Sequence, residues 1–329
     1  MGCCLRACFR ARVPVSPPLE ERVFSFLEGR AGPLVITFLL LTGCGGTTSH
    51  RGSADPTVVD DAGRAVHLDA PAHRVVSLLP SITELIVALG AGDRLIARTG
   101  FDTARSLAHL PSLGRTLEPN PEAVAVLAPE LVLAGRGRSE ATLVEPLEAM
   151  GVPVYVAVVE DVADIHSTLR RLGRLLGLDG RADSLVAALE SGLERARDRR
   201  RSAPRPTVLY VVWHDPPVVA GPGTYIDELI TIAGGANAFA DAAAHWPAVS
   251  LEEVVRRDPD YIVVSRDGGD STPPGWLHEL PGWRGLRAVV EGRLVIVDPD
   301  VFNRPGPRVV DAAHTLARAL RPTRREVRP

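Results

Sequence analysis

The stretch 120–133 reads NPEAVAVLAPELVL, and the stretch 250–263, which reads SLEEVVRRDPDYIV, repeats it in the second half of the chain without a gap. Each copy has a helix-capping residue, a glutamate two positions later, and a Pro-acid pair before an apolar run. Upstream, 84–91 (ELIVALGA) pairs in the same way with 228–235 (ELITIAGG). A duplicated order of strand, helix and turn predicts two similar α/β lobes.

Short apolar runs rich in branched residues surround both copies of the repeat. Such continuous runs are typical of parallel strands buried on both faces of a sheet. Three runs lie in each half and follow one another in the same order, which supports the duplication. The predicted strands are Val75–Leu79, Leu131–Ala134 and Val152–Val156 in the first half, and Val208–Val212, Tyr261–Val264 and Leu294–Val297 in the second.

A long helical stretch without proline, from Val162 to Arg201, separates the halves. We expect Gly177 to Gly180 to break it, leaving a connecting helix over 181–201 that ends before Pro204 and Pro206. A helix of about 20 residues is roughly 30 Å long, so it can hold two small lobes at a fixed separation.

The N-terminal region predicts export and a lipid anchor. The apolar run Pro33–Cys44, with Arg30 as its positive flank, has the length of a signal-peptide core and is too short to span a membrane. Its end, Leu41-Thr42-Gly43-Cys44, resembles the bacterial lipobox, in which the cysteine is lipidated, and 45–53 then predicts a flexible tether. The alternative is a buried strand with an incidental cysteine. Residues 1–29 fit neither a leader nor a domain.

Composition excludes several classes of function. The net charge of −3 gives no reason to expect nucleic acid as a partner. The chain has no Lys, which excludes a lysine Schiff base or a phosphate-loop lysine, and no Cys after position 44, which excludes disulfides and cysteine metal sites in 45–329. Dinucleotide, phosphate-loop and nucleophile-elbow motifs are absent, so we predict no enzyme and no cofactor. The alternatives left open are a zinc site or a lipid-anchored enzyme or sensor; zinc would need four scattered histidines to converge: His67, His109, His214 and His245.

From about Arg74 to Leu320 the chain resembles the substrate-binding proteins of iron-siderophore, haem and vitamin B12 importers. The matching stretches are 74–84 (RVVSLLPSITE), the two glutamate motifs, 233–237 (AGGAN) and 304–308 (RPGPR). The resemblance implies two Rossmann-like lobes with mostly parallel sheets, joined by a long rigid helix. The expected divisions are 1–43 leader and signal peptide, 44–73 tether and lead-in, 74–180 first lobe, 181–203 connecting helix, 204–321 second lobe and 322–329 tail.

The two repeat glutamates gain a role from the resemblance. Asn120 and Ser250 are good N-caps, so Glu122 and Glu252 fall in the first turn of a helix, where its dipole favours a carboxylate. Helix capping alone would explain them. In this family, a glutamate at each position docks in arginine pockets of the permease. Glu253 is expected to complete a capping box with Ser250.

Ligand contacts are expected from loops at the carboxyl ends of the strands, where open α/β sheets bind. Trp246 resembles the aromatic residue that B12-binding members place against their ligand. Aromatic residues expected there before Glu122 and after Ala134 are replaced by Thr116 or Leu117 and by Gly135. The predicted ligand-binding residues are Ser81, Phe101, Asp102, Trp213, Trp246, Asp300 and Arg304.

The resemblance therefore implies an exported, lipid-anchored monomer that binds cobalamin or a related corrinoid and delivers it to the permease of an ABC importer. A ferric siderophore and haem are the alternatives for the ligand. Arg136 and Arg138 would suit a carboxylate-bearing or catecholate chelate, although an exposed loop explains them equally well. The predicted partners are the permease subunits, the chelate, and the membrane through the lipid anchor.

Overall fold

The computed structural model describes residues 56–115, 119–137, 140–198, 205–266 and 273–320. These residues belong to one compact unit, Gly52–Pro329. Cys44, the predicted signal segment and Arg138 lie outside the described residues.

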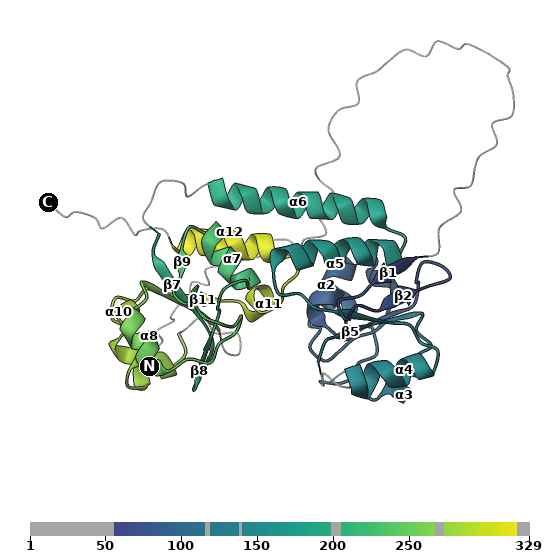
Figure 1. The fold of residues 1–329 in the computed structure, drawn as a ribbon, viewed down its shortest axis with the longest axis horizontal. Helices are drawn as coiled ribbons and strands as arrows, with labels where there is room; N and C mark the ends of the chain where they lie inside the picture. The colour runs from purple at the N-terminus through teal and green to yellow at the C-terminus, as the bar shows by residue number, and fades with distance from the viewer. Residues whose placement is uncertain (1–55, 116–118, 138–139, 199–204, 267–272, 321–329) are drawn as a thin grey trace, which may run out of the picture. The chain divides into compact units, whose positions relative to one another are not determined.

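The first lobe is built on a parallel sheet with strand order β4-β3-β5-β6. A hairpin of β1 and β2, which are antiparallel, precedes it, and β1 packs against α5 (Figure 1). The strands are β1 (Thr57–Val59), β2 (Ala65–His67), β3 (Val75–Ser77), β4 (Leu95–Ala97), β5 (Leu131–Gly135) and β6 (Val154–Ala157). The helices are α2 (Pro80–Ala88), α3 (Pro121–Ala125), α4 (Glu145–Ala149) and α5 (Val162–Leu175), with short helical turns at Gly92–Arg94, Arg105–Leu107 and Glu140–Val144.

The second lobe repeats this topology. Strand β7 pairs in parallel with β9 and β10, and β10 with β11, so β9-β7-β10-β11 corresponds to β4-β3-β5-β6; β8 adds an antiparallel hairpin to β7. The strands are β7 (Thr207–His214), β8 (Pro217–Val219), β9 (Ala236–Asn237), β10 (Tyr261–Ser265) and β11 (Leu294–Val297). The helices are α7 (Tyr225–Ile232), α8 (Leu251–Arg257), α9 (Trp276–Glu279), α10 (Arg287–Val290), α11 (Pro299–Phe302) and α12 (Val309–Ala319), with a helical turn at Trp283–Gly285.

All six predicted strands are present, and the prediction of two α/β lobes is confirmed. The Pro-acid pair of the repeat has a structural reason. Glu130 Oε2 accepts the backbone N–H groups of His73 and Arg74, just before β3, at 2.6 and 3.1 Å. Asp260 Oδ2 accepts the N–H of Thr207, the first residue of β7, at 2.9 Å. The acid therefore fixes the start of β3 beside β5 in the first lobe and the start of β7 beside β10 in the second.

Helix α6 (Asp179–Asp198) connects the lobes. Its 20 residues correspond to roughly 30 Å of helix, as the sequence predicted. The break after α5 lies at Gly177, whose φ of 65° ends the helix by the left-handed conformation that glycine tolerates. Gly180 is inside α6, so the connecting helix begins two residues before the predicted Arg181. Of the predicted stops, Pro206 lies directly before β7, and Pro204 lies outside the described residues.

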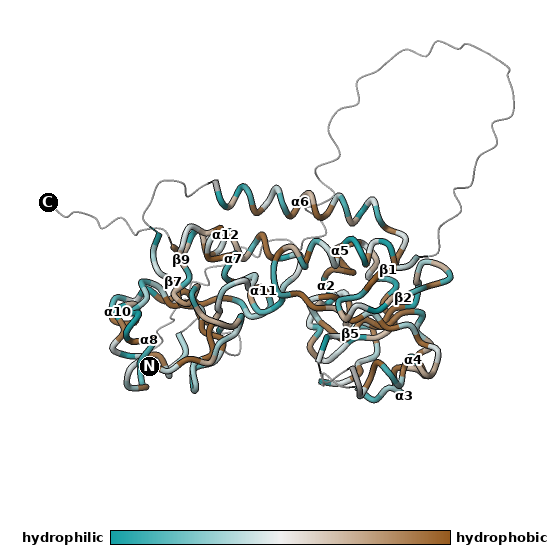
Figure 2. The backbone as a smooth tube through the Cα atoms, in the orientation of Figure 1, coloured by the Kyte–Doolittle hydropathy of each residue, from teal (hydrophilic) through white to brown (hydrophobic). Residues whose placement is uncertain are grey.

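One hydrophobic core runs along the α6 side of both lobes. It contains Leu85 of α2, Leu169 of α5, Leu189 of α6, Ile226 of α7 and Leu316 of α12, all 5% exposed or less. The opposite faces of the two sheets have separate cores, around Val132 and around Ile262. Figure 2 shows the apolar strands inside each lobe and alternating polar and apolar residues along α6. The lobes thus share a continuous core next to the connecting helix.

Candidate ligand-binding and docking sites

Four of the predicted ligand-binding residues lie at or just beyond the carboxyl ends of parallel strands. Ser81 is in the first turn of α2 after β3, and Phe101 follows β4. Trp213 is near the end of β7, and Asp300 lies in α11, directly after β11. Ends of this kind are where ligands approach open α/β sheets. Both lobes therefore present predicted contact residues from the same edge of their sheets.

Phe101, Asp300 and Arg304 are brought into direct contact across the lobes. Arg304 Nη2 donates to the carbonyl oxygen of Phe101 at 2.9 Å and lies 2.8 Å from Asp300 Oδ1. Thr103 Oγ1 donates to Asp300 Oδ2 at 3.1 Å. The Phe101 ring carries the guanidinium of Arg115 at 4.9 Å from its centroid. The polar groups of Asp300 and Arg304 thus have protein partners in this structure.

Asp102 faces inward. Its side chain is 7% exposed, and Oδ2 accepts both the backbone N–H and the hydroxyl of Thr99 at 2.7 Å. These bonds close the turn that follows β4 and present Phe101. A carboxylate used in this way shapes the site through its neighbour.

Trp246 lies in a loop, as the sequence predicted. It precedes Ala248, which pairs with Val218 of β8. Its indole N–H donates to Oε2 of Glu160, from the other lobe, at 3.3 Å, and its ring lies 6.1 Å from that of Tyr225. His245 Nδ1 is 3.6 Å from the same carboxylate oxygen. Glu160 was not predicted as a site residue, because nothing local to 160 distinguishes a glutamate that faces another lobe from one that faces water, and His245 was considered only as a zinc ligand.

The prediction that Trp213 sits in a loop is wrong. It belongs to β7 and pairs with Val218 of β8, because β7 continues past the parallel sheet into a hairpin. The side chain is 57% exposed, and its N–H donates to the carbonyl of Asp215 at 2.8 Å. Its ring lies 5.2 Å from that of His214, which stacks on Trp276. Trp213 and Trp246 therefore belong to two separate aromatic groups of the second lobe.

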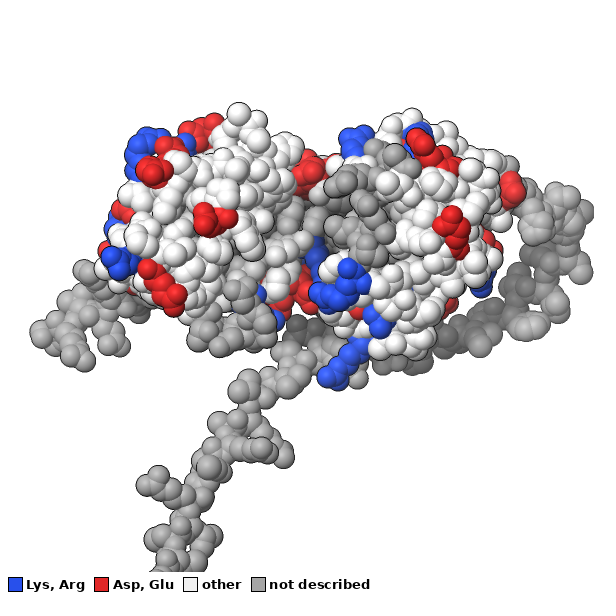
Figure 3. All heavy atoms as spheres, turned by 90° about the horizontal axis from the view of Figure 1, so that it is seen from below, with Lys and Arg blue, Asp and Glu red and all other residues white. Residues whose placement is uncertain are grey.

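Glu122 and Glu252 occupy equivalent, exposed positions. The Asn120 side chain accepts the N–H of Glu122 at 2.8 Å, and the Ser250 hydroxyl accepts that of Glu253 at 3.1 Å, so both predicted N-caps are confirmed. Each glutamate sits in the first turn of its helix, α3 or α8. Both helices lie on the side away from α6 in Figure 1, and Figure 3 looks onto that side, where carboxylates appear on both halves.

The predicted capping box at Ser250 is only half formed. The carboxylate of Glu253 is held by Arg256, with Nε at 2.8 Å, and by Nε of Arg257 at 2.6 Å. These two guanidinium groups lower the pKa of Glu253 to about 2. Two arginines one turn along the helix compete better for the carboxylate than the single backbone N–H of the cap. Glu252 keeps its exposed position beside this cluster.

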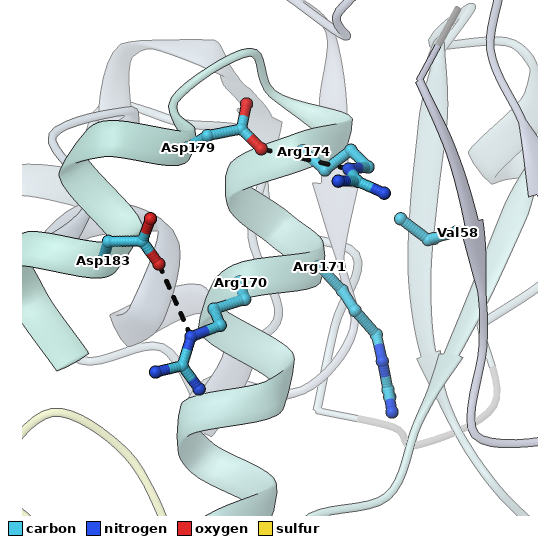
Figure 4. Close-up of a pocket in the computed structure, with 6 residues that line it drawn as sticks. All are labelled: Val58, Arg170, Arg171, Arg174, Asp179 and Asp183. Atoms are coloured by element: carbon cyan, nitrogen blue, oxygen red, sulfur yellow. Dashed lines mark ion pairs between the residues drawn. The ribbon is translucent and has the colours of Figure 1, made fainter.

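A pocket near α5 and α6 has a structural explanation. Figure 4 shows its arginines along α5 and its acids on α6. Arg170 lies 3.5 Å from Asp183, Arg174 lies 3.9 Å from Asp179, and Arg171 bonds to Asp61. The first two pairs hold α5 against α6, and the third ties α5 to the turn between β1 and β2. Among the described residues, no three His, Cys, Asp or Glu side chains are grouped to hold a metal, and none of the helices is long and apolar enough to cross a bilayer.

Comparisons with known proteins match the chain along most of its length. Residues 75–301 match the periplasmic binding protein family. The chain is 32% identical over 257 residues to a vitamin B12-binding protein of Yersinia pestis, covering 76% of this chain and 86% of that one. It is 28% identical to the ABC transporter substrate-binding lipoprotein YvrC of Bacillus subtilis, covering 90% and 98%. The solved periplasmic haem-binding protein RhuT of Roseiflexus, in apo form, is 30% identical with a TM-score of 0.67, covering 75% and 97%.

Proposed function

The chain belongs to the periplasmic binding protein family, and we propose that it is the extracytoplasmic solute-binding protein of an ABC importer, with cobalamin or a related corrinoid as its ligand. The relatives named above are solute-binding proteins rather than enzymes, which supports a binding role without chemistry.

The observation that carries the ligand proposal is that each lobe places an aromatic residue where it contacts the other lobe, Phe101 at Arg304 and Trp246 at Glu160. Phe101 comes from the first lobe, and Trp213 and Trp246 come from the second. Flat conjugated chelates offer a large apolar face, and aromatic side chains provide the matching area with one polar handle. Glu160 orients Trp246 through the indole N–H. The 32% identity to a B12-binding protein supports a corrinoid as one chelate of this shape.

Haem is the second candidate. The Arg115 guanidinium over Phe101 places a positive charge beside the aromatic surface, and haem carries two carboxylates that arginine would recognise. The similarity to a haem-binding protein at 30% identity supports the same alternative.

Titration of purified residues 54–329 tests both candidates. Cobalamin is expected to quench tryptophan fluorescence in a saturable way, because Trp213 is exposed and Trp246 is half-buried. Haem and several ferric siderophores form the parallel arms of the experiment. Saturable quenching by haem alone would transfer the assignment to haem. Silence across every chelate would contradict the binding function itself.

For delivery, we propose that Glu122 and Glu252 dock in basic pockets of the permease. The two acids occupy the same position of the repeat, one on each lobe, and are exposed. Each is followed within one turn by an exposed valine: Val126 is 84% exposed and Val255 is 45% exposed. An exposed apolar side chain beside a carboxylate is typical of a protein interface, where charge fixes orientation and apolar contact adds affinity.

We also propose that Cys44 is lipidated and anchors the exported protein to a membrane. The similarity to a substrate-binding lipoprotein over 90% of this chain supports the anchor. In the expressing bacterium, Cys44→Ala is expected to move most of the protein out of the membrane fraction, because one cysteine carries all of the attached lipid. Fractionation followed by immunoblotting measures this change, with Cys8→Ala as the matched control. Unchanged membrane association of Cys44→Ala would contradict the lipobox.

A further inference from the structure

Glu84 of α2 is bound by two arginines of the other lobe. Its Oε1 accepts from Arg304 Nη1 at 3.0 Å and from Arg308 Nη2 at 2.5 Å, while Oε2 accepts from Arg308 Nε at 3.0 Å. The arginine side chains are 17% and 25% exposed, and that of Glu84 is 19% exposed. Arg308 therefore makes a bidentate, partly desolvated ion pair, which is the strong form of such a contact.

The same two arginines reach residues that line the predicted ligand site. Arg304 also binds the carbonyl of Phe101, and Arg308 also binds the backbone carbonyl of Asp300. α2 and α11 lie on facing sides of the two lobes, below α6 (Figure 1). The contact is thus a further connection between the lobes, separate from the connecting helix.

The repeat supplies an equivalent contact in the opposite direction. Glu228 of α7 corresponds to Glu84, and its carboxylate lies near the backbone N–H of Val162, the first residue of α5. Arg308, the partner of Glu84, is the N-cap residue of α12. Both α5 and α12 pack on α6. Each glutamate therefore lies at the start of a helix of the other lobe, Glu84 at α12 and Glu228 at α5. The dipole of a helix favours a carboxylate at that end.

The two equivalent contacts differ in charge. Glu84 faces two guanidinium groups, whereas Glu228 is partly buried near Asp161 and Asp227. Burial first, and then the charge of Asp161, raise the pKa of Glu228. Burial and Asp161 therefore disfavour the charged form of Glu228, whereas two guanidinium groups stabilise the charge of Glu84.

We propose that the ion cluster of Glu84, Arg304 and Arg308 locks the two lobes at a fixed separation and so sets the width of the ligand site. Glu84 and Arg308 are positioning residues. Glu84 holds Arg304, which binds the Phe101 carbonyl of the first lobe, and it holds Arg308, which binds the Asp300 carbonyl of the second lobe. The site itself rests on the proposed function, but the lock is a property of the ligand-free protein. α6 and its shared core restrain the lobes on one side, and the cluster restrains them on the facing side.

The test compares Glu84→Gln with Glu228→Gln, which is the matched control from the repeat. Residues 54–329 contain no cysteine, so spin labels on Val126→Cys and Val255→Cys report one distance between the lobes. In ligand-free protein, Glu84→Gln is expected to at least double the width of the distance distribution. Glu228→Gln is expected to leave it unchanged, because glutamine can also accept a hydrogen bond from the Val162 N–H. An unchanged width in Glu84→Gln, or equal broadening in both variants, would overturn the lock.

Arg308→Lys keeps the proposal testable should Glu84→Gln fail to fold. Lysine retains the charge but cannot bind the carboxylate bidentately, so an intermediate broadening is expected and an unchanged distribution would overturn the lock. A ligand readout separates the two proposals. If cobalamin or haem binds, Glu84→Gln should raise its dissociation rate at least threefold, and an unchanged rate would remove the positioning role. If no chelate binds the parent protein, the proposed function fails, while the distance measurement still decides the lock.

Discussion

Replacing Glu122 and Glu252 together by alanine is expected to abolish uptake while leaving ligand affinity unchanged. The reason is geometric: both acids are exposed, each in the first turn of its helix, and both helices lie on the side away from α6 (Figure 1). Losing a charge-assisted contact at an interface costs about 2 kcal/mol or more, so two together weaken docking by roughly a thousandfold. Transport of labelled ligand by cells or proteoliposomes measures the effect.

A charge-matched control comes from neighbouring helices. Glu145 of α4 and Glu279 of α9 are also exposed acids, and their double alanine variant changes the net charge by the same amount. It is expected to transport normally. A loss of ligand affinity in the Glu122/Glu252 variant would mean that these acids face the ligand, and normal uptake would mean that the docking surface lies elsewhere.

Trp246→Ala is expected to weaken ligand binding about 30-fold, equivalent to about 2 kcal/mol for the loss of a central aromatic contact. The indole lies at the boundary between the lobes, since its N–H reaches Glu160 of the first lobe. Isothermal titration with the chelate that the fluorescence titration selects measures the change.

Two further variants separate the causes. Trp246→Phe keeps an aromatic face but cannot donate to Glu160, so most of the affinity should remain if ring contact is the source. Trp276→Phe alters a tryptophan that stacks on His214, away from Trp246, and should bind like the parent protein. Equal losses in Trp246→Ala and Trp276→Phe would indicate a general effect on the second lobe rather than a contact with the ligand.

Electrostatic contacts divide into those that sequence predicts and those that it does not. Asn120 and Ser250 cap their helices as expected, because a cap bonds to N–H groups two or three residues away. The carboxylate of Glu253 does not complete the expected capping box, because it binds Arg256 and Arg257 instead of the backbone N–H of Ser250. Both sets of hydrogen bonds join residues within four positions, but the partner of Glu253 depends on which of several nearby groups binds its carboxylate more strongly.

The chain by itself determined the six predicted strands, their duplication, the break at Gly177 and the approximate length of the connecting helix. These features depend on apolar periodicity and on backbone preferences that act over a few residues. Only the tertiary structure joined Glu84 to Arg304, 220 residues away, and placed Trp246 against Glu160. Contacts between lobes depend on how two separately folded surfaces meet, and no local pattern encodes that meeting.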